Sequence, residues 1–140
     1  MAEDRWKKLW DDLKPQVSSF AQKAGETAKK AGEAISDMAK TLGKESAKLA
    51  KIGKLKADIL ILEGNRTDSF KKMGERLYDA LKNEEPLLKE KFDDLLKELT
   101  DIETKISDKQ KEIEEIAKEE KLEPEDVSKI PAVVDEEKKD

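Results

Sequence analysis

Apolar residues recur along the first part of the chain at spacings of +3, +4 and +4, a pattern that repeats every 11 residues. Fourteen of the fifteen positions from Trp6 to Ala57 are apolar or glycine, and Ser46 is the exception. A helix with this period, about 3.67 residues per turn, carries its apolar stripe almost straight along one face. The pattern predicts an amphipathic helix over residues 1–50, with either a break or a new helix start at Pro15.

The large side chains of this stripe gather at its N-terminal end, where two tryptophans stand four residues apart. Between residues 24 and 34 the stripe is only alanine, and several glycines interrupt the segment. Because glycine disfavours helix, we expect residues 16–50 to become helical against a surface rather than alone. The residues predicted to bind that surface, a membrane or a partner, are Trp6, Leu9, Trp10, Leu13, Val17 and Phe20.

Larger apolar residues alternate at +4 and +3 spacing in two later segments, on either side of the sequence KNEEPLL at 82–88. Two such seams joined by a short turn predict an antiparallel coiled-coil hairpin over residues 51–120, with its turn near 83–86. Pro86 is suited to the first turn of the second helix, and Asn83 to its cap. The predicted seam residues are Leu62, Phe70, Leu77, Phe92, Leu99 and Ile106.

Two charged residues, Arg66 and Lys109, interrupt the seam. Such residues either fix the helix register or cover the seam with their stems while their charges reach water. After Lys121 the apolar pattern fails, apart from one possible helical turn after Pro124. We therefore expect residues 121–140 to form a charged flexible tail, either a solubilising end or a docking segment.

The composition supports an all-α fold, because no stretch rich in β-branched residues alternates apolar and polar positions as a strand does. Charged residues make up 45% of the chain, and their signs are unevenly spread. Residues 1–82 hold 18 basic and 13 acidic residues, and residues 83–140 hold 11 and 21. The net charges of +5 and −10 favour pairing of the two hairpin helices.

The chain contains neither cysteine nor histidine. Disulfides, thiolate nucleophiles, the usual zinc ligands and the commonest general base are therefore excluded. We predict no catalytic residues, no cofactor, no metal site and no small-molecule substrate. The net charge of −5 and the lack of aromatic residues among the basic ones also argue against nucleic-acid binding.

The segment FAQKAGETAKKAGEAISDMAK at 20–40 resembles the 11-residue repeats of group 3 late-embryogenesis-abundant proteins, whose period apolipoproteins and synucleins share. The resemblance covers about residues 13–57 and implies a helix that forms on membranes or on drying. The order of an N-terminal amphipathic helix and a helical hairpin is also similar to that of the phage-shock membrane-remodelling family. This second likeness is one of architecture alone.

The leading functional hypothesis is a non-enzymatic peripheral membrane protein of the cytoplasm, active at the membrane surface or in membrane stress. Tryptophan favours the headgroup boundary, and the neighbouring lysines attract an anionic membrane surface. The alternative is a soluble helical scaffold or adaptor whose stripe packs on its own hairpin or on a helical protein partner. In either case the hairpin is a candidate for homo-oligomer formation.

Overall fold

The computed structural model describes residues 2–13 and 17–133 of the 140, and side chains within residues 4–13 and 30–133. Every element of this part is a helix and none is a strand, which confirms the all-α class. The order along the chain is α1 (Ala2–Leu13), α2 (Val17–Leu42), α3 (Ser46–Lys82), the short 3-10 helix η2 (Lys89–Phe92), α4 (Asp93–Glu119) and α5 (Pro124–Lys129).

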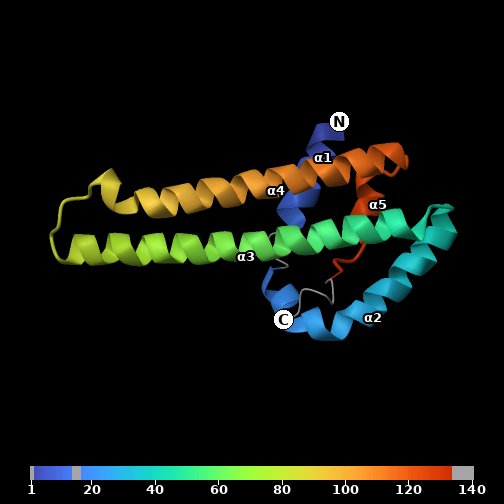
Figure 1. Ribbon diagram of the computed structural model, residues 1–140, viewed down its shortest axis with the longest axis horizontal. Coiled ribbons are helices and arrows are strands. Elements are labelled where there is room, and N and C mark those ends of the chain that lie inside the picture. The colour runs from blue at the N-terminus through green and yellow to red at the C-terminus, as the bar shows by residue number, and fades with distance from the viewer. Residues whose placement is uncertain (1, 14–16, 134–140) are drawn as a thin grey trace.

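An antiparallel hairpin of the two long helices α3 and α4 forms the frame of the molecule (Figure 1). Ion pairs between these helices mark its register, and two of them show it well. Arg76 Nη1 lies 2.7 Å from Asp94 Oδ1, and Lys109 Nζ lies 3.3 Å from Asp58 Oδ2. These pairs have the alignment expected for a chain that folds back near 83–86, and Lys109 in the seam has a carboxylate partner.

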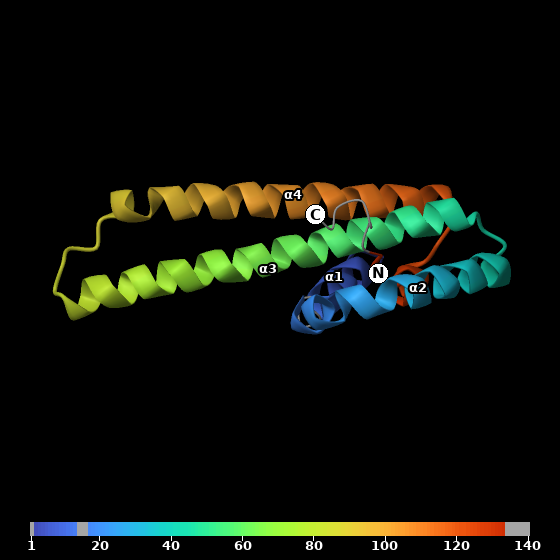
Figure 2. The same ribbon diagram turned by 60° about the horizontal axis from the view of Figure 1, so that its bottom comes forward.

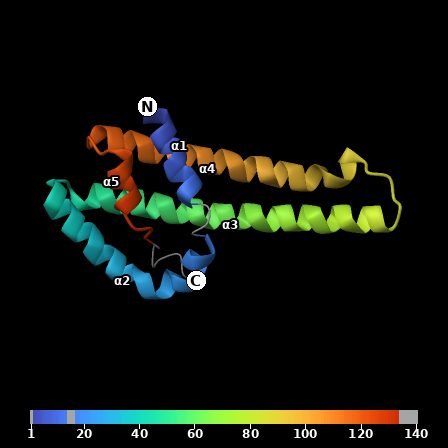
Figure 3. The ribbon, with the colours of Figure 1, turned by 180° about the vertical axis from the view of Figure 1, so that it is seen from behind.

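The other three helices form a second layer over one end of this hairpin (Figure 2). α2 runs along α3, while α1 crosses α4 and ends beside α3 on the side that faces the viewer in Figure 3. α5 lies beside α1 on that side. The opposite end of the hairpin, which carries the turn, projects beyond this layer.

The hydrophobic core lies where the two layers meet. It joins residues of α1, α2, α3, α4 and α5 in one cluster. Its most deeply buried members expose at most 1% of their surface; they are Leu49, Ile52, Ile59, Ile113, Ala117, Val127 and Ile130. The closed core is therefore built on one half of the hairpin, the half away from its turn.

Three helices end in the same backbone motif, in which one residue adopts a left-handed conformation. Gly43 has φ 68° after α2, Glu84 has φ 56° after α3, and Lys121 has φ 57° after α4. In each case the next amide donates back to a carbonyl five residues earlier, as in Lys44 N to Ala39 O at 2.9 Å. Only the first position is glycine, the residue that adopts this conformation without strain.

The helix predicted over residues 1–50 is wrong in its C-terminal boundary, because the chain turns at Gly43 and α3 already begins at Ser46. The apolar stripe with the 11-residue period is therefore divided near Gly43 between two helices, α2 and α3, which pack on each other. The predicted break at Pro15 lies outside the described residues, between the end of α1 and the start of α2.

The predicted start of the second hairpin helix is also wrong. α4 begins at Asp93, after η2, and Pro86 lies in the loop rather than in a first helical turn. Asn83 ends α3, with its backbone N–H donating to Asp79 O and the N–H of Glu84 donating to Leu81 O, instead of starting the next helix. The left-handed Glu84 turns the chain away from the helix axis, so several extended residues precede η2.

The prediction of a flexible tail over residues 121–140 is wrong for its described part. Leu122, Val127 and Ile130 are buried in the core. Val127 belongs to α5, and the other two residues flank this helix. The physical reason is their spacing, which places three apolar side chains on the inner side of a single helical turn and its flanks. Residues 134–140 lie outside the described part of the chain.

Gly53 lies where the C-terminal segment packs closely on α3, so the stability of the protein should be sensitive to a side chain at this position. A Cβ at this position would lie 2.7 Å from Pro131 O and 2.8 Å from Val133 Cγ2. Gly53→Ala should therefore lower the free energy of unfolding by about 1–3 kcal/mol, measured by urea denaturation.

Gly32 in α2 is the matched control, because nothing lies within 4 Å of a Cβ built there. Gly32→Ala should raise the free energy of unfolding by about 0.5–1 kcal/mol through helix propensity alone. Equal effects of the two substitutions would contradict the packing of residues 131–133 on α3.

Candidate functional site

The apolar face of α1, which holds four of the six predicted binding residues, is turned inward. Leu9 and Leu13 expose only 6% and 3% of their surface. Trp6 and Trp10 pack against the same core while remaining partly exposed, and their rings stack with centroids 5.9 Å apart. The protein's own hairpin thus covers the described part of this face.

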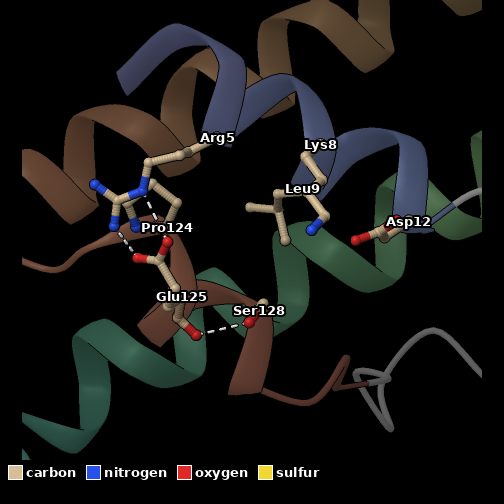
Figure 4. Close-up of a pocket in the computed structure, with 7 residues that line it drawn as sticks. All are labelled: Arg5, Lys8, Leu9, Asp12, Pro124, Glu125 and Ser128. Atoms are coloured by element: carbon tan, nitrogen blue, oxygen red, sulfur yellow. Dashed lines mark hydrogen bonds and ion pairs between the residues drawn. The ribbon is translucent and has the colours of Figure 1, made fainter. Parts of the chain in front are cut away.

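A polar contact between α1 and α5 holds the outer edge of the helix (Figure 4). Arg5 Nε donates to Glu125 Oε1 at 2.7 Å, Arg5 Nη2 pairs with the second oxygen, and Glu123 Oε2 lies 3.3 Å from Nη2. The guanidinium holds the pKa of the Glu125 carboxyl below its usual range. Because these groups are exposed to water, they orient α1 more than they stabilise it.

The hollow beside this contact is the pocket drawn in Figure 4, with a volume of about 280 Å³. Helices α1 and α5 supply its lining, which consists of Arg5, Lys8, Leu9, Asp12, Pro124, Glu125 and Ser128. The guanidinium and the Glu125 carboxylate already satisfy each other across it. Its polar groups therefore serve the docking of α1.

A buried lysine of α3 bonds to the C-terminal end of α5. Lys56 on α3 is 4% exposed, and its ammonium donates to Ile130 O at 2.6 Å and to Val127 O at 3.0 Å. Carbonyl groups at the C-terminal end of a helix have no partner within the helix and carry partial negative charge. Lys56 thus supplies donors to the end of α5, and its burial lowers its pKa to about 8.

The projecting end of the hairpin is the second candidate surface. We define the arm as residues 66–99, the part of α3, η2 and α4 that extends past α1. Two predicted seam residues of the arm are not sealed between its helices, since Phe70 is 47% and Leu77 39% exposed. The prediction of a closed seam is therefore wrong in the arm at these two positions.

Small side chains explain this difference. Ser69 and Ala80 are 1% and 4% exposed in a part of α3 that has only α4 beside it. Arg76, seven residues after Ser69, bonds to Asp94 of α4. Helical spacing places these three residues on one line, so they face α4, and Phe70 is displaced to the edge.

The remaining seam predictions agree better with the structure. Leu99 and Ile106 are buried, and Leu62 and Phe92 are partly buried. The side chains of Val17 and Phe20, the last two predicted binding residues, lie outside the described part. Their contribution to the N-terminal surface stays a prediction.

A polar cluster marks the border between the covered end and the arm. Glu63, only 8% exposed, pairs with Arg66 at 3.4 Å, and the guanidinium of Arg66 lies 5.3 Å from the centre of the Phe70 ring. Trp10 of α1 and Ile106 of α4 line a hollow together with Glu63 and Arg66. α1 therefore crosses the hairpin at this point and leaves everything beyond it uncovered.

Sequence reasoning missed Lys56 and the residues of α5. The available signal was the position of Lys56, four residues after Ile52 and three before Ile59, which places it on their buried face. A lysine on an apolar helical face favours carbonyl or carboxylate partners, and the C-terminal carbonyls supply them.

Among the described side chains, no group of three or more acidic residues is arranged to hold a metal ion. Within the same described range, each helix is too short or too polar to cross a bilayer. The two surfaces that remain are the closed face of α1 and the exposed face of the arm.

The burial of Lys56 should make the free energy of unfolding depend on pH. Below pH 8 the ammonium is charged in both states, so its burial cost is present in full. Between pH 8 and 10.5 the unfolded chain binds the extra proton, and the free energy of unfolding rises with pH. Relative to Lys56→Met, the wild type should gain roughly 2–3 kcal/mol from pH 7 to pH 10.5.

Urea denaturation of both proteins at several pH values measures this difference, and titration of other groups cancels between them. A difference that stays constant from pH 7 to pH 10.5 would contradict the burial of a charged Lys56.

Comparisons with known proteins give no match from which a function could be argued. The sequence matches no protein-family model, and comparison with curated proteins and with solved structures gives no significant match.

Proposed function

We propose that this protein is a non-enzymatic helical scaffold of the cytoplasm, whose N-terminal amphipathic helix packs on its own hairpin. The observation that carries the proposal is the burial of Leu9 and Leu13. Leu9 shares its core with residues of α2, α3, α4 and α5, so the apolar face of α1 already has an occupant. The lack of cysteine in the chain fits a reducing compartment.

In this proposal the covered end and the arm have different tasks. The covered end is the folded base, in which α1, α2 and α5 bury the apolar residues of one hairpin half. The arm projects from this base and presents apolar side chains to a partner. Two helices joined rigidly to a core are suited to display such a surface, because little entropy is lost when it binds.

A membrane surface is the second candidate, and one observation favours it. Trp6 and Trp10 lie at the rim of the core and remain partly exposed, with Lys7 and Lys8 exposed beside them. If α1 were released, these residues would form the interfacial face that the sequence predicts. The cost of release is the exposure of Leu9 and Leu13.

Tryptophan fluorescence distinguishes the two candidates, because both tryptophans of the chain lie in α1. In buffer the emission should already lie to the blue of the urea-unfolded protein, and vesicles of phosphatidylglycerol and phosphatidylcholine should leave it unchanged. Red emission in buffer that shifts to the blue with these vesicles would instead support the membrane candidate.

A pair of variants ties the emission to the docking of α1. Leu9→Asp places a charge in the core and should shift the emission to the red by releasing the helix. Lys8→Asp introduces the same residue at an exposed neighbouring position and should leave the emission maximum in place. The proposal fails if both variants behave like the wild type.

A further inference from the structure

The exposed apolar residues of this protein are concentrated in the arm. Of the eight large apolar side chains that are exposed in the described part of the chain, seven lie between residues 70 and 96. Their exposed fractions run from 38% to 64%. These residues are Phe70, Leu77, Tyr78, Leu81, Leu87, Leu88 and Leu96.

On α3, these residues continue a face that is covered elsewhere in the molecule. Glu63 lines the hollow beside Trp10, so its side of α3 is the side that α1 covers. Phe70 and Leu77 follow Glu63 at seven-residue steps, and Leu81 follows one turn later. Helical spacing therefore places all of them on the same side of α3.

On α4 the same relation holds for Leu96. Glu103 and Gln110 line the hollow beside Trp10, and Leu96 precedes Glu103 by seven residues. Both arm helices thus present apolar residues on the side that α1 covers near the base. We call this continuous surface, formed by Phe70, Leu77, Leu81 and Leu96, the arm face.

We propose that a second copy of this chain packs antiparallel on the arm face, so that two arms form a four-helix bundle. The proposal rests on the proposed scaffold function, and it names the partner as the protein itself. Each copy covers the other's arm, as α1 and α2 cover the base. The contact is isologous, since the same residues meet from both sides.

The available surface is large enough for a stable dimer. The four apolar side chains of the arm face expose roughly 350 Å² per copy, so two copies would bury roughly 700 Å² of apolar surface. Because apolar atoms make up about 60% of an interface, the polar groups around them bring the total to roughly 1,200 Å², the lower bound for specific interfaces. The arm also carries eight basic and nine acidic residues, a net charge of −1, so like-charge repulsion does not oppose its pairing.

The position of α1 selects the antiparallel arrangement. In a parallel pair the two α1 helices would lie on the facing sides at the same level and would collide (Figure 2). In an antiparallel pair each tip lies beside the partner's α1.

Sedimentation equilibrium of the full chain tests the proposal. The wild type should reach twice the chain mass between micromolar and submillimolar concentration. Leu77→Glu combined with Leu81→Glu should raise the dissociation constant about 100-fold or more, because four buried leucines per dimer are lost. Both residues are exposed in a single chain, so circular dichroism should show an unchanged helix content.

Ile61→Glu is the matched control. Ile61 is 50% exposed on the same helix, but it lies nine residues before Phe70 and therefore on the opposite side of α3. This variant should dimerise like the wild type. A wild type that stays monomeric at submillimolar concentration, or equal loss of dimer in both variants, overturns the proposal.

A cysteine cross-link tests the arrangement, since the chain has no cysteine of its own. Gly74 lies near the middle of the arm, and nothing lies within 4 Å of a Cβ built there. Mild oxidation of Gly74→Cys should give a disulfide-linked dimer, whereas Ile61→Cys should stay monomeric. Cross-linking of Ile61→Cys alone would overturn the antiparallel contact.

The outcomes separate this inference from the scaffold proposal. A monomeric wild type whose tryptophan emission is blue and insensitive to vesicles would refute the dimer and leave the closed base in place. Vesicle binding that Leu77→Glu and Leu81→Glu abolish would overturn the dimer in favour of a lipid surface on the arm.

Discussion

The arrangement of the helices in this protein depends on the need to bury one apolar face of α3. Two paired helices can seal only the seam between them, and each keeps further apolar residues outside that seam. On α3 these residues run from Ile52 through Ile59 to Phe70 and Leu77 at helical spacing. The base meets this constraint with the second layer of α1, α2 and α5, which buries Ile52 and Ile59 to 1% or less exposure. The same face stays open in the arm, because the second layer ends where α1 crosses the hairpin.

The heptad pattern was sufficient to predict the hairpin and its register. Leu99 and Ile106 lie in the seam as expected, and the pairing of Arg76 with Asp94 has the alignment of a chain that reverses near 83–86. Both results follow from periodicity and a short connection, which are local properties of a sequence. Gly43 was a local signal that the predicted boundary at residue 50 missed, since it occupies the left-handed position that ends α2.

The parts that could not be predicted depend on contacts between distant residues. Ser69 and Ala80 are buried on the side of α3 that faces α4, and Phe70 lies exposed at the edge, although Phe70 fits the heptad pattern better. The burial of Val127 within an acidic segment depends on Lys56, 71 residues earlier in the chain, whose ammonium bonds to its carbonyl. The first choice is not visible in spacing, and for the second the spacing marks Lys56 and Val127 as buried without showing that they meet. The candidate surface on α1 was found from the sequence, but whether its occupant is lipid or the protein itself is set by the fold of all five helices.

The central claim is that α1 is part of the folded base, and hydrogen exchange followed by mass spectrometry tests it most directly. Amides of α1 should exchange slowly, together with those of α3 around Leu49 to Leu60, because they open only when the base unfolds. The account predicts that Leu9→Asp speeds exchange in α1 and α5 together. Rapid exchange of α1 in the wild type, at the rate of an unstructured peptide while α3 and α4 stay protected, would contradict it.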